Sequence, residues 1–278
     1  VIGMDQKVDI QALVADHTSQ VGKNHTRSRF LVSTSTQRRK SADIRLVGQH
    51  SDVYEPCDDS FALVDALLAD RVHLEEARPS LCLELGCGSG YVITSLALML
   101  GQESGIQYLA TDISSAATEV THKTLAAHGV HADVILADLA SGLDKRLAGT
   151  VDVLVVNPPY VPTSEEEVGG DGIAAAWAGG ENGRSVIDRI LALVDNLLSI
   201  KGWFYLVTLT ANNPSEICLI MKQKGFASRI IVQRSTEEES LHVLKFWRDP
   251  SEIITDFGTS PPQSLTRRLS RLAFWKNS

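Results

Sequence analysis

The sequence predicts an α/β protein built on a doubly wound, seven-stranded sheet that is mostly parallel and has one antiparallel strand. Two observations predict this fold. Short apolar runs alternate with amphipathic segments of helical period from about residue 46 to residue 248. The last two apolar runs, 229–234 and 241–247, are joined by a short acidic loop. A connection of that length permits an antiparallel pair but not a parallel crossover.

The apolar runs before that pair predict the parallel strands, because strands buried on both faces are apolar throughout. In chain order they are expected at 81–85, 107–111, 133–137, 151–156 and 203–209. The segments between them are predicted to be helical: about 90–100, from Ser114 or Ser115 to His128, 184–200, and a last helix that begins at Asn213.

Capping residues support these helices. Ser114 or Ser115 can cap the second one, and Gly129 can end it. Asn213 is followed by Pro214 and, three residues after the cap, by Glu216, a strong helix start. In the helix predicted over 184–200, one face holds the apolar residues, and Gly202 is expected to end it. Those apolar residues are Val186, Ile187, Ile190, Val194, Leu197 and Leu198.

The two ends of the chain differ from the body. Residues 1–45 hold eight Lys or Arg against four Asp, a net charge of +4, with little hydrophobic periodicity. They predict a disordered basic leader, and an organelle targeting segment of similar composition is the alternative. Residues 249–278 predict a weakly ordered C-terminal tail, so the folded domain is expected at 46–248.

Composition excludes several classes of protein. The whole chain carries −8, so the remainder after residue 45 carries −12, which disfavours non-specific binding to a phosphate backbone and suits a basic protein partner. No apolar run approaches the roughly 20 residues of a membrane span. The four cysteines form no C-x-x-C pair, so neither a metal site nor a disulfide framework is expected, and a reducing compartment fits better.

A glycine turn follows the first predicted strand. The segment Glu84-Leu85-Gly86-Cys87-Gly88-Ser89-Gly90 lacks the G-x-G-x-x-G spacing of a dinucleotide fingerprint, because the third glycine comes one residue early. Its G-x-G-x-G form, preceded by an acid, resembles motif I of S-adenosylmethionine methyltransferases. Gly86, Gly88 and Gly90 are therefore candidate cofactor-binding residues, and a simple glycine turn is the alternative.

Acids at three successive strand ends extend this site. Asp112 ends the second strand, where it could accept hydrogen bonds from ribose hydroxyls, and Asp138 follows the third, where it could accept one from an adenine amino group. Leu139 is assigned to the same cofactor site. Glu84 could bind the ammonium group of the cofactor or hold the glycine turn. Helix capping is the alternative for each Asp alone.

The motif Asn157-Pro158-Pro159-Tyr160 ends the fourth strand. Two prolines stiffen the turn and remove two backbone donors, which leaves the Asn157 side-chain oxygen and the Pro158 carbonyl as acceptors. Those acceptors suit an NH2 group on a planar substrate, against which Tyr160 could stack. We predict Asn157, Pro158 and Tyr160 as catalytic residues, the whole motif as the substrate site, and Asn157 as a further cofactor contact. A rigid polar turn is the alternative.

Four segments, in order, resemble the eukaryotic HemK-type protein-glutamine methyltransferases, which are class I methyltransferases with a Rossmann-like sheet. The segments are Tyr54 to Phe61 (YEPCDDSF), Glu84 to Gly90 (ELGCGSG), Asn157 to Val161 (NPPYV) and Ala176 to Arg184 (AWAGGENGR). The resemblance covers about residues 46–248. Where the family usually has Glu, this chain has Asp58.

The resemblance implies S-adenosyl-L-methionine as cofactor, with Ser60 near it. It implies methylation of the glutamine in the Gly-Gly-Gln loop of the eukaryotic class I translation release factor. The expected location is the cytoplasm, and the nucleus is a second location left open. It further implies a heterodimer with a small zinc-containing activator subunit, which pairs along the edge strand near residues 130–138. For Asp58-Asp59-Ser60, helix capping before the apolar run is the alternative.

Other functions remain open from the sequence. Histone lysine methylation is linked to the family, although a lysine amine is not planar. Adenine in nucleic acid offers a planar NH2, but the acidic body and the lack of a target-reading domain disfavour it. A non-catalytic cofactor-binding subunit would not need the intact motif, and the glycine spacing disfavours a dinucleotide oxidoreductase.

Overall fold

The computed structural model describes residues 41–102, 105–169, 172–235 and 240–248. Most of the predicted leader, residues 1–40, and the whole predicted tail, 249–278, lie outside the described residues. None of the helices in the described ranges is both long and apolar enough to cross a membrane.

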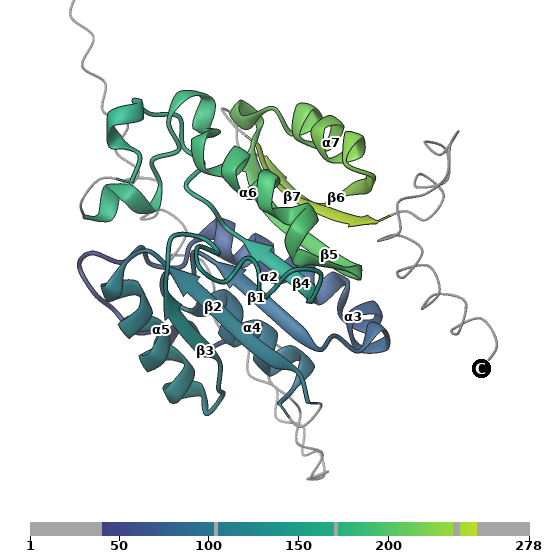
Figure 1. Cartoon of the computed structure of the whole chain (residues 1–278). Helices are drawn as coiled ribbons and strands as arrows, with labels where there is room; N and C mark the ends of the chain where they lie inside the picture. The colour runs from purple at the N-terminus through teal and green to yellow at the C-terminus, as the bar shows by residue number, and fades with distance from the viewer. Residues whose placement is uncertain (1–40, 103–104, 170–171, 236–239, 249–278) are drawn as a thin grey trace, which may run out of the picture. The chain divides into compact units, whose positions relative to one another are not determined.

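The described residues form a seven-stranded sheet in the order β3-β2-β1-β4-β5-β7-β6 (Figure 1). Strand β7 lies between β5 and β6 and runs antiparallel to both, which confirms the predicted fold with its single antiparallel strand. The strands are β1 (Leu81–Leu85), β2 (Gln107–Asp112), β3 (Asp133–Leu136), β4 (Val151–Val156), β5 (Leu198–Leu209), β6 (Phe226–Ser235) and β7 (Ser240–Arg248).

Helices cover both faces of the sheet. One layer holds α2 (Asp58–Ala69), α3 (Arg71–Ala77), α4 (Tyr91–Leu100) and α5 (Ser115–His128), and the other holds α6 (Ser185–Leu197) and α7 (Pro214–Gln223). Short 3-10 helices join them: η1 (Ile44–Leu46), η2 (Glu165–Glu167), η3 (Ile173–Ala176), η4 (Glu181–Gly183) and η5 (Thr210–Asn212).

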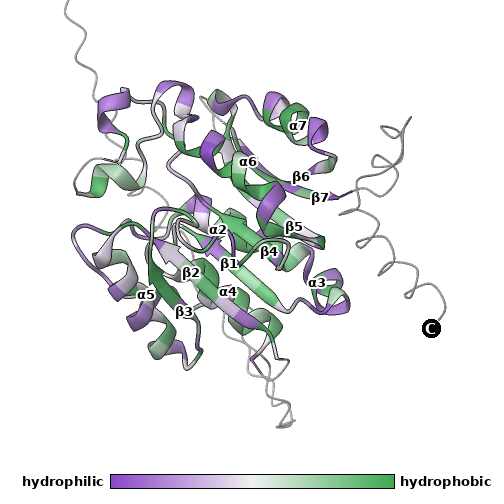
Figure 2. Ribbon diagram, in the orientation of Figure 1, coloured by the Kyte–Doolittle hydropathy of each residue, from purple (hydrophilic) through white to green (hydrophobic). Residues whose placement is uncertain are grey.

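Alternate residues of each central strand point into two separate apolar cores. In β4, Val153 and Val155 pack towards α2 to α5, whereas Leu154 and Val156 pack towards α6 and α7. Figure 2 shows the central strands as predominantly hydrophobic, as expected for strands covered on both faces.

The predicted caps are present. Ser114 caps α5 by accepting a hydrogen bond from the Ala117 N–H, and Gly129 ends the helix with φ of 65°. Asn213 caps α7 by accepting from the Glu216 N–H.

The helix predicted over 184–200 is shorter than expected. It ends at Leu197, and Leu198, expected on its apolar face, is instead the first residue of β5, opposite Val151. Gly202 lies inside β5 and does not end the helix. A Cβ there would lie 2.7 Å from the Val151 carbonyl oxygen, so glycine lets the two strands approach closely. The apolar pattern therefore continued from helix into strand without a signal at the junction.

Residues 41–48, which lie on both sides of the predicted boundary at residue 45, contact α4 and α5. The Ala42 N–H donates to the Ser95 hydroxyl at 3.0 Å, and the Gly48 N–H donates to the Thr124 hydroxyl at 3.0 Å. Ala42 is buried in the core beside α4. This short segment thus runs across α4 and α5.

We expect Ile217→Ala to lower the free energy of unfolding by about 2–5 kcal/mol, because Ile217 is fully buried between α7 and the sheet. Leu219, two residues later on α7, is 55% exposed, so Leu219→Ala should change stability by less than about 0.5 kcal/mol. Urea denaturation of both variants measures the difference. Equal losses would contradict the placement of α7.

Candidate active site

The glycine turn after β1 is anchored to the neighbouring strand β2. The N–H groups of Gly86 and Cys87 both donate to the Thr111 carbonyl, at 2.8 and 3.0 Å. Gly86 and Gly88 have φ of 75° and 50°, and a Cβ on either would meet nothing within 4 Å. The missing side chains therefore leave open space in front of the turn.

The third glycine, Gly90, has a different role. A Cβ on Gly90 would lie 2.8 Å from the Thr121 Cα, so glycine lets α5 pack directly against the turn. Thr121 also donates a hydrogen bond to the Gly88 carbonyl at 3.1 Å, and Thr124 donates to the Ser89 carbonyl at 2.7 Å. Helix α5 thus fixes the turn from behind.

Glu84 is buried beneath this turn, with 2% of its surface exposed. Its Oε2 accepts a hydrogen bond from the Ile93 N–H at 2.9 Å, in the first turn of α4. Burial raises the pKa of Glu84 well above its ordinary value, and the nearby Asp112 adds to this effect. This contact joins Glu84 to the helix that follows the glycine turn. Both roles given to Glu84 from the sequence, binding an ammonium group or holding the turn, stay predictions.

Asp112, at the end of β2, is oriented by two backbone donors. Its Oδ2 accepts from the Gly88 N–H at 2.8 Å and its Oδ1 from the Ser114 N–H at 2.9 Å. Burial raises the pKa of Asp112, although these backbone hydrogen bonds act in the opposite direction. Each carboxylate oxygen keeps a further lone pair, so the predicted contact to a ribose hydroxyl remains a prediction.

Asp138 and Leu139 follow β3. Asp138 is exposed and forms an ion pair with Arg189 at 2.6 Å. Leu139 has φ of 52°, which turns the chain away from the strand. Their cofactor roles stay predictions. Ile113 follows Asp112 and is 63% exposed. The sequence analysis did not select it, although an apolar residue directly after an acid at a strand end could have indicated it.

Asn157 directly follows β4, and its side-chain oxygen is the polar atom on which its predicted role depends. Oδ1 is buried and, within the described residues, has no hydrogen-bond partner. A buried acceptor without a partner costs roughly 1–3 kcal/mol. Pro158, the next residue, is buried. The predicted contact of this oxygen with a substrate NH2 group stays a prediction.

Tyr160 is held in place by α2, and its predicted stacking against the substrate stays a prediction. Its hydroxyl donates to Asp59 Oδ2 at 2.8 Å, and its ring packs against both apolar cores. Burial raises the pKa of Tyr160, and the carboxylate of Asp59 raises it further. The tyrosine side chain is therefore held by α2, and the sequence had treated Asp59 only as a helix-capping acid.

Asp59 also accepts hydrogen bonds from two residues near it at the start of α2. It is 5% exposed and accepts hydrogen bonds from the Cys57 thiol at 3.0 Å and the Ser60 hydroxyl at 3.1 Å. Ser60 is buried, and its predicted contact with the cofactor stays a prediction. This acidic residue links the start of α2 to the Asn157–Tyr160 turn.

The segment 176–184, which resembles a family motif, packs against the same turn. The Val161 N–H donates to the Trp177 carbonyl at 3.0 Å, and the Gly179 N–H donates to the Val161 carbonyl at 2.8 Å. Asn212, after β5, bonds to both segments and was not found from the sequence.

The structure thus brings the glycine turn, Asp112 and Asn157 to the carboxyl edge of three adjacent strands (Figure 1). Among the described residues, no group of three or more His, Cys, Asp or Glu could hold a metal ion. A parallel sheet with a glycine turn, strand-end acids and an amide acceptor has the arrangement of a class I methyltransferase.

Comparison with known proteins agrees with this class. The sequence-family model described as "Methyltransferase small domain" matches residues 59–227. Human "Methyltransferase HEMK2" is 49% identical over 199 residues, covering 72% of this chain and 91% of the relative. The Schizosaccharomyces pombe "eRF1 methyltransferase catalytic subunit mtq2" is 36% identical over 210 residues, covering 72% of this chain and 91% of the relative.

A solved structure, that of the E. cuniculi Mtq2–Trm112 complex, is similar with a TM-score of 0.52 and 30% identity, over 71% of this chain and 99% of the matched chain. The chain therefore belongs to the methyltransferase small domain family and, within it, to the HemK-type group that includes HEMK2 and Mtq2.

We expect Glu84→Gln to make the stability of the ligand-free protein less dependent on pH. The pKa of Glu84 is raised in the folded chain. Between the pKa of Glu84 in the unfolded chain and its higher pKa in the folded chain, the folded state therefore binds more protons than the unfolded state. The free energy of unfolding of the wild type therefore falls through that window. Glutamine has no such proton to lose and still offers an oxygen to the Ile93 N–H.

Urea denaturation at about pH 5 and about pH 8 measures this effect. The stability of Glu84→Gln relative to the wild type should rise with pH. A difference that stays constant between the two conditions would show that Glu84 does not titrate in this way.

Proposed function

We propose that this protein uses S-adenosyl-L-methionine to methylate the side-chain nitrogen of the glutamine in the Gly-Gly-Gln loop of the eukaryotic class I translation release factor. It acts as the catalytic subunit of a heterodimer with a small zinc-containing subunit. A substrate in the translation machinery puts this reaction in the cytoplasm.

The observation that carries the proposal is the buried, unpartnered Oδ1 of Asn157. A primary amide has two N–H groups, and Asn157 Oδ1 together with the Pro158 carbonyl can accept both. Within the described part of the chain, no hydrogen bond reaches the Pro158 carbonyl. Two acceptors on a proline-stiffened turn select an NH2 group and leave its nitrogen lone pair facing the methyl donor.

These acceptors match the chemistry of an amide. Its nitrogen lone pair is delocalised, so the nitrogen is a poor nucleophile and becomes partly positive as its new bond to carbon forms. The oxygen dipoles of Asn157 and Pro158 stabilise that charge where it develops. The extra proton leaves to solvent after the transfer, so no residue is assigned as a catalytic base.

The strand-end residues fit the proposed cofactor. When bound, S-adenosylmethionine supplies an electrophilic methyl group on a positively charged sulfur. The open space before Gly86 and Gly88 lets backbone approach a ligand closely, and Asp112 has lone pairs for ribose hydroxyls. Exposed Ile113, beside Asp112, offers an apolar surface to a flat base. A positively charged group bound near Glu84 and Asp112 would favour their ionised forms and oppose the rise in pKa that burial causes.

The relatives support the choice of substrate over other amino groups. The fission yeast relative is named as an eRF1 methyltransferase, and the E. cuniculi complex is described as responsible for the methylation of the eRF1 termination factor.

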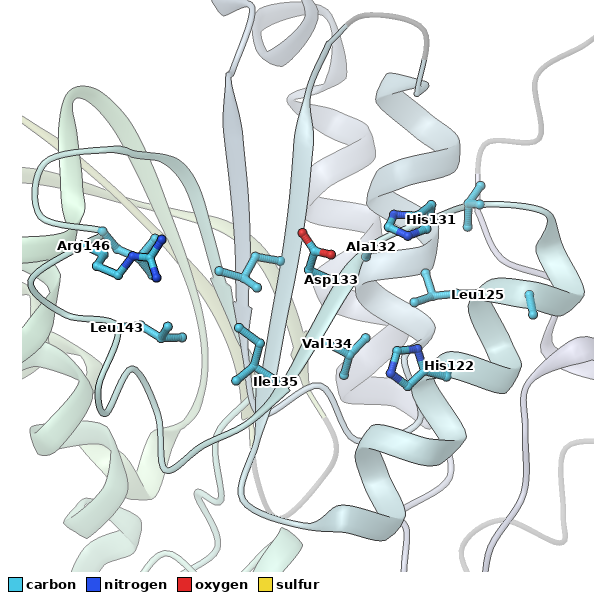
Figure 3. Close-up of a pocket in the computed structure, with 13 residues that line it drawn as sticks. His122, Leu125, His131, Ala132, Asp133, Val134, Ile135, Leu143 and Arg146 are labelled. Atoms are coloured by element: carbon cyan, nitrogen blue, oxygen red, sulfur yellow. The ribbon is translucent and has the colours of Figure 1, made fainter.

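The free edge of the sheet supports a partner subunit. Strand β3 is the first strand in the sheet order, and Leu136 at its end is 58% exposed. A groove of about 720 Å³ lies along this edge, between α5, β3 and the loop that follows (Figure 3). Its labelled lining residues include His122, Leu125, Val134, Ile135, Leu143 and Arg146. A partner that adds a strand here would satisfy the edge and cover these side chains.

The first test is methyl transfer from labelled S-adenosylmethionine to recombinant release factor, with this protein co-expressed with the small zinc subunit. The matched control is a release factor with Ala in place of the loop glutamine. Label on the normal factor alone supports the proposal. Label on neither factor, with cofactor binding intact, would refute it and direct the assay to histone and to DNA.

In the same assay we expect Asn157→Ala to lower the transfer rate roughly 100- to 1000-fold, as for the loss of one preorganised polar group, with nearly unchanged cofactor affinity. Asp112→Ala should do the reverse and weaken cofactor binding by about 1.5–3 kcal/mol, measured by calorimetry. Loss of cofactor binding in Asn157→Ala, or an unchanged dissociation constant in Asp112→Ala, would contradict the assigned roles.

We expect Leu136→Lys to weaken binding of the partner subunit, because a charge would replace an exposed apolar side chain on the free edge. Leu219→Lys is the control, since Leu219 is similarly exposed, at 55%, on a helix that packs against the opposite end of the sheet. Co-purification from a shared expression measures the effect. Equal recovery of the partner with both variants would place the interface elsewhere.

A further inference from the structure

Asn212 lies at the end of η5, and its side chain is fully buried. Its Nδ2 donates to the Tyr160 carbonyl at 2.8 Å and to the Asn182 carbonyl at 2.9 Å, and its Oδ1 accepts from the Leu209 N–H at 2.7 Å. A side-chain amide has two hydrogens to donate, so both are directed at carbonyls of two different loops. The side chain therefore ties the Asn157–Tyr160 turn and the η4 turn to the end of β5.

The two turns approach each other closely where Asn212 joins them. A Cβ on Gly183 would lie 1.9 Å from the Tyr160 carbonyl oxygen and 2.4 Å from Asn212 Nδ2. A Cβ on Gly179 would lie 2.9 Å from the Pro159 carbonyl oxygen. Glycine at both positions lets backbone meet backbone, so the turn has little freedom to move on this side.

The position of Asn212 is itself fixed by Arg184. The guanidinium, whose side chain is 12% exposed, donates to the Asn212 carbonyl at 3.0 Å. It also forms ion pairs with Asp188 at 2.6 Å and with Glu216 at 3.2 Å. The support for the turn thus extends into both α6 and α7.

We propose that Asn212 is a positioning residue for methyl transfer, which holds the Asn157–Tyr160 turn at the spacing that its two acceptors need. The inference rests on the proposed function. Two prolines stiffen the turn, so a displacement at Tyr160 is carried back to Asn157. A small misplacement of acceptors in an active site can lower the rate by the order of 100-fold.

The residue acts on the substrate side of the site. Its side-chain hydrogen bonds in the described ranges go to the turn, to η4 and to Leu209, and none goes to the glycine turn or to Asp112. Loss of these bonds should therefore change the transfer rate and leave cofactor affinity nearly unchanged.

Two variants and one control test this role on the full chain with its partner subunit. Asn212→Asp keeps the shape but directs a carboxylate at carbonyl oxygens, and Asn212→Ala removes the bonds without adding a charge. Asn213→Gly is the control, because the neighbouring Asn213 has φ of 53°, which glycine adopts readily, and caps α7 without touching the turn.

Asn212→Ala and Asn212→Asp should lower kcat roughly 10- to 100-fold, with the Kd for S-adenosylmethionine within about twofold of the wild type. Asn213→Gly should keep both values. If Asn212→Asp fails to fold, Asn212→Ala carries the test. Wild-type kcat in Asn212→Ala would overturn the inference. Loss of cofactor binding in proportion to activity would also overturn it, because Asn212 would then serve the fold in general.

Hydrogen exchange gives a second readout that needs no substrate. The amides of Val161, Thr163, Gly179 and Gly183 donate to carbonyls within these turns. Their exchange should accelerate in Asn212→Ala, while exchange in β1 stays as in the wild type. Unchanged exchange at the turns would refute the inference. If the wild-type protein leaves release factor unmethylated, only the proposed function is refuted. The exchange comparison would still decide whether Asn212 holds the two turns.

Discussion

The parallel pairing of β1 with both β2 and β4 is the constraint on which the site depends. Leu85 lies opposite Thr111 on one side and Val156 on the other, so three strands end at the same level. The glycine turn, Asp112 and Asn157 are the next residues of those three strands. An antiparallel neighbour would have delivered its last residue to the other edge of the sheet. The backbone pairing of these strands alone therefore brings the residues of the site to one edge of the sheet.

The burial that stabilises this ladder also sets the electrostatics of the site. Helices cover both faces, so Glu84 and Asp112 lie in surroundings that disfavour their charged forms and raise their pKa values. Each acid is compensated by backbone donors at a helix start or in the glycine turn. These donors fix the direction in which each carboxyl group points.

The sequence was sufficient for features whose signals are local. Strands, helix caps and the Asn157–Tyr160 motif follow from apolar period, turn chemistry and strand-end position. The predicted helix end at residue 200 was wrong, because an apolar residue such as Leu198 fits both the last turn of a helix and the first position of a buried strand. The roles of Asp59 and Asn212 could not be predicted, because their partner Tyr160 lies 101 and 52 residues away along the chain.

The motif explains why such distant residues are needed. Proline at 158 and 159 removes two N–H groups, so the turn cannot hold itself through its own backbone hydrogen bonds. It must be fixed from outside, and Tyr160 is held at both ends: its hydroxyl by Asp59 of α2 and its carbonyl by Asn212 after β5. Within the described residues, the Asn157 side-chain oxygen and the Pro158 carbonyl oxygen accept no hydrogen bond. A turn that satisfied its own acceptors would be more stable alone, but it would have none left for the two amide hydrogens that the proposed function assigns to it.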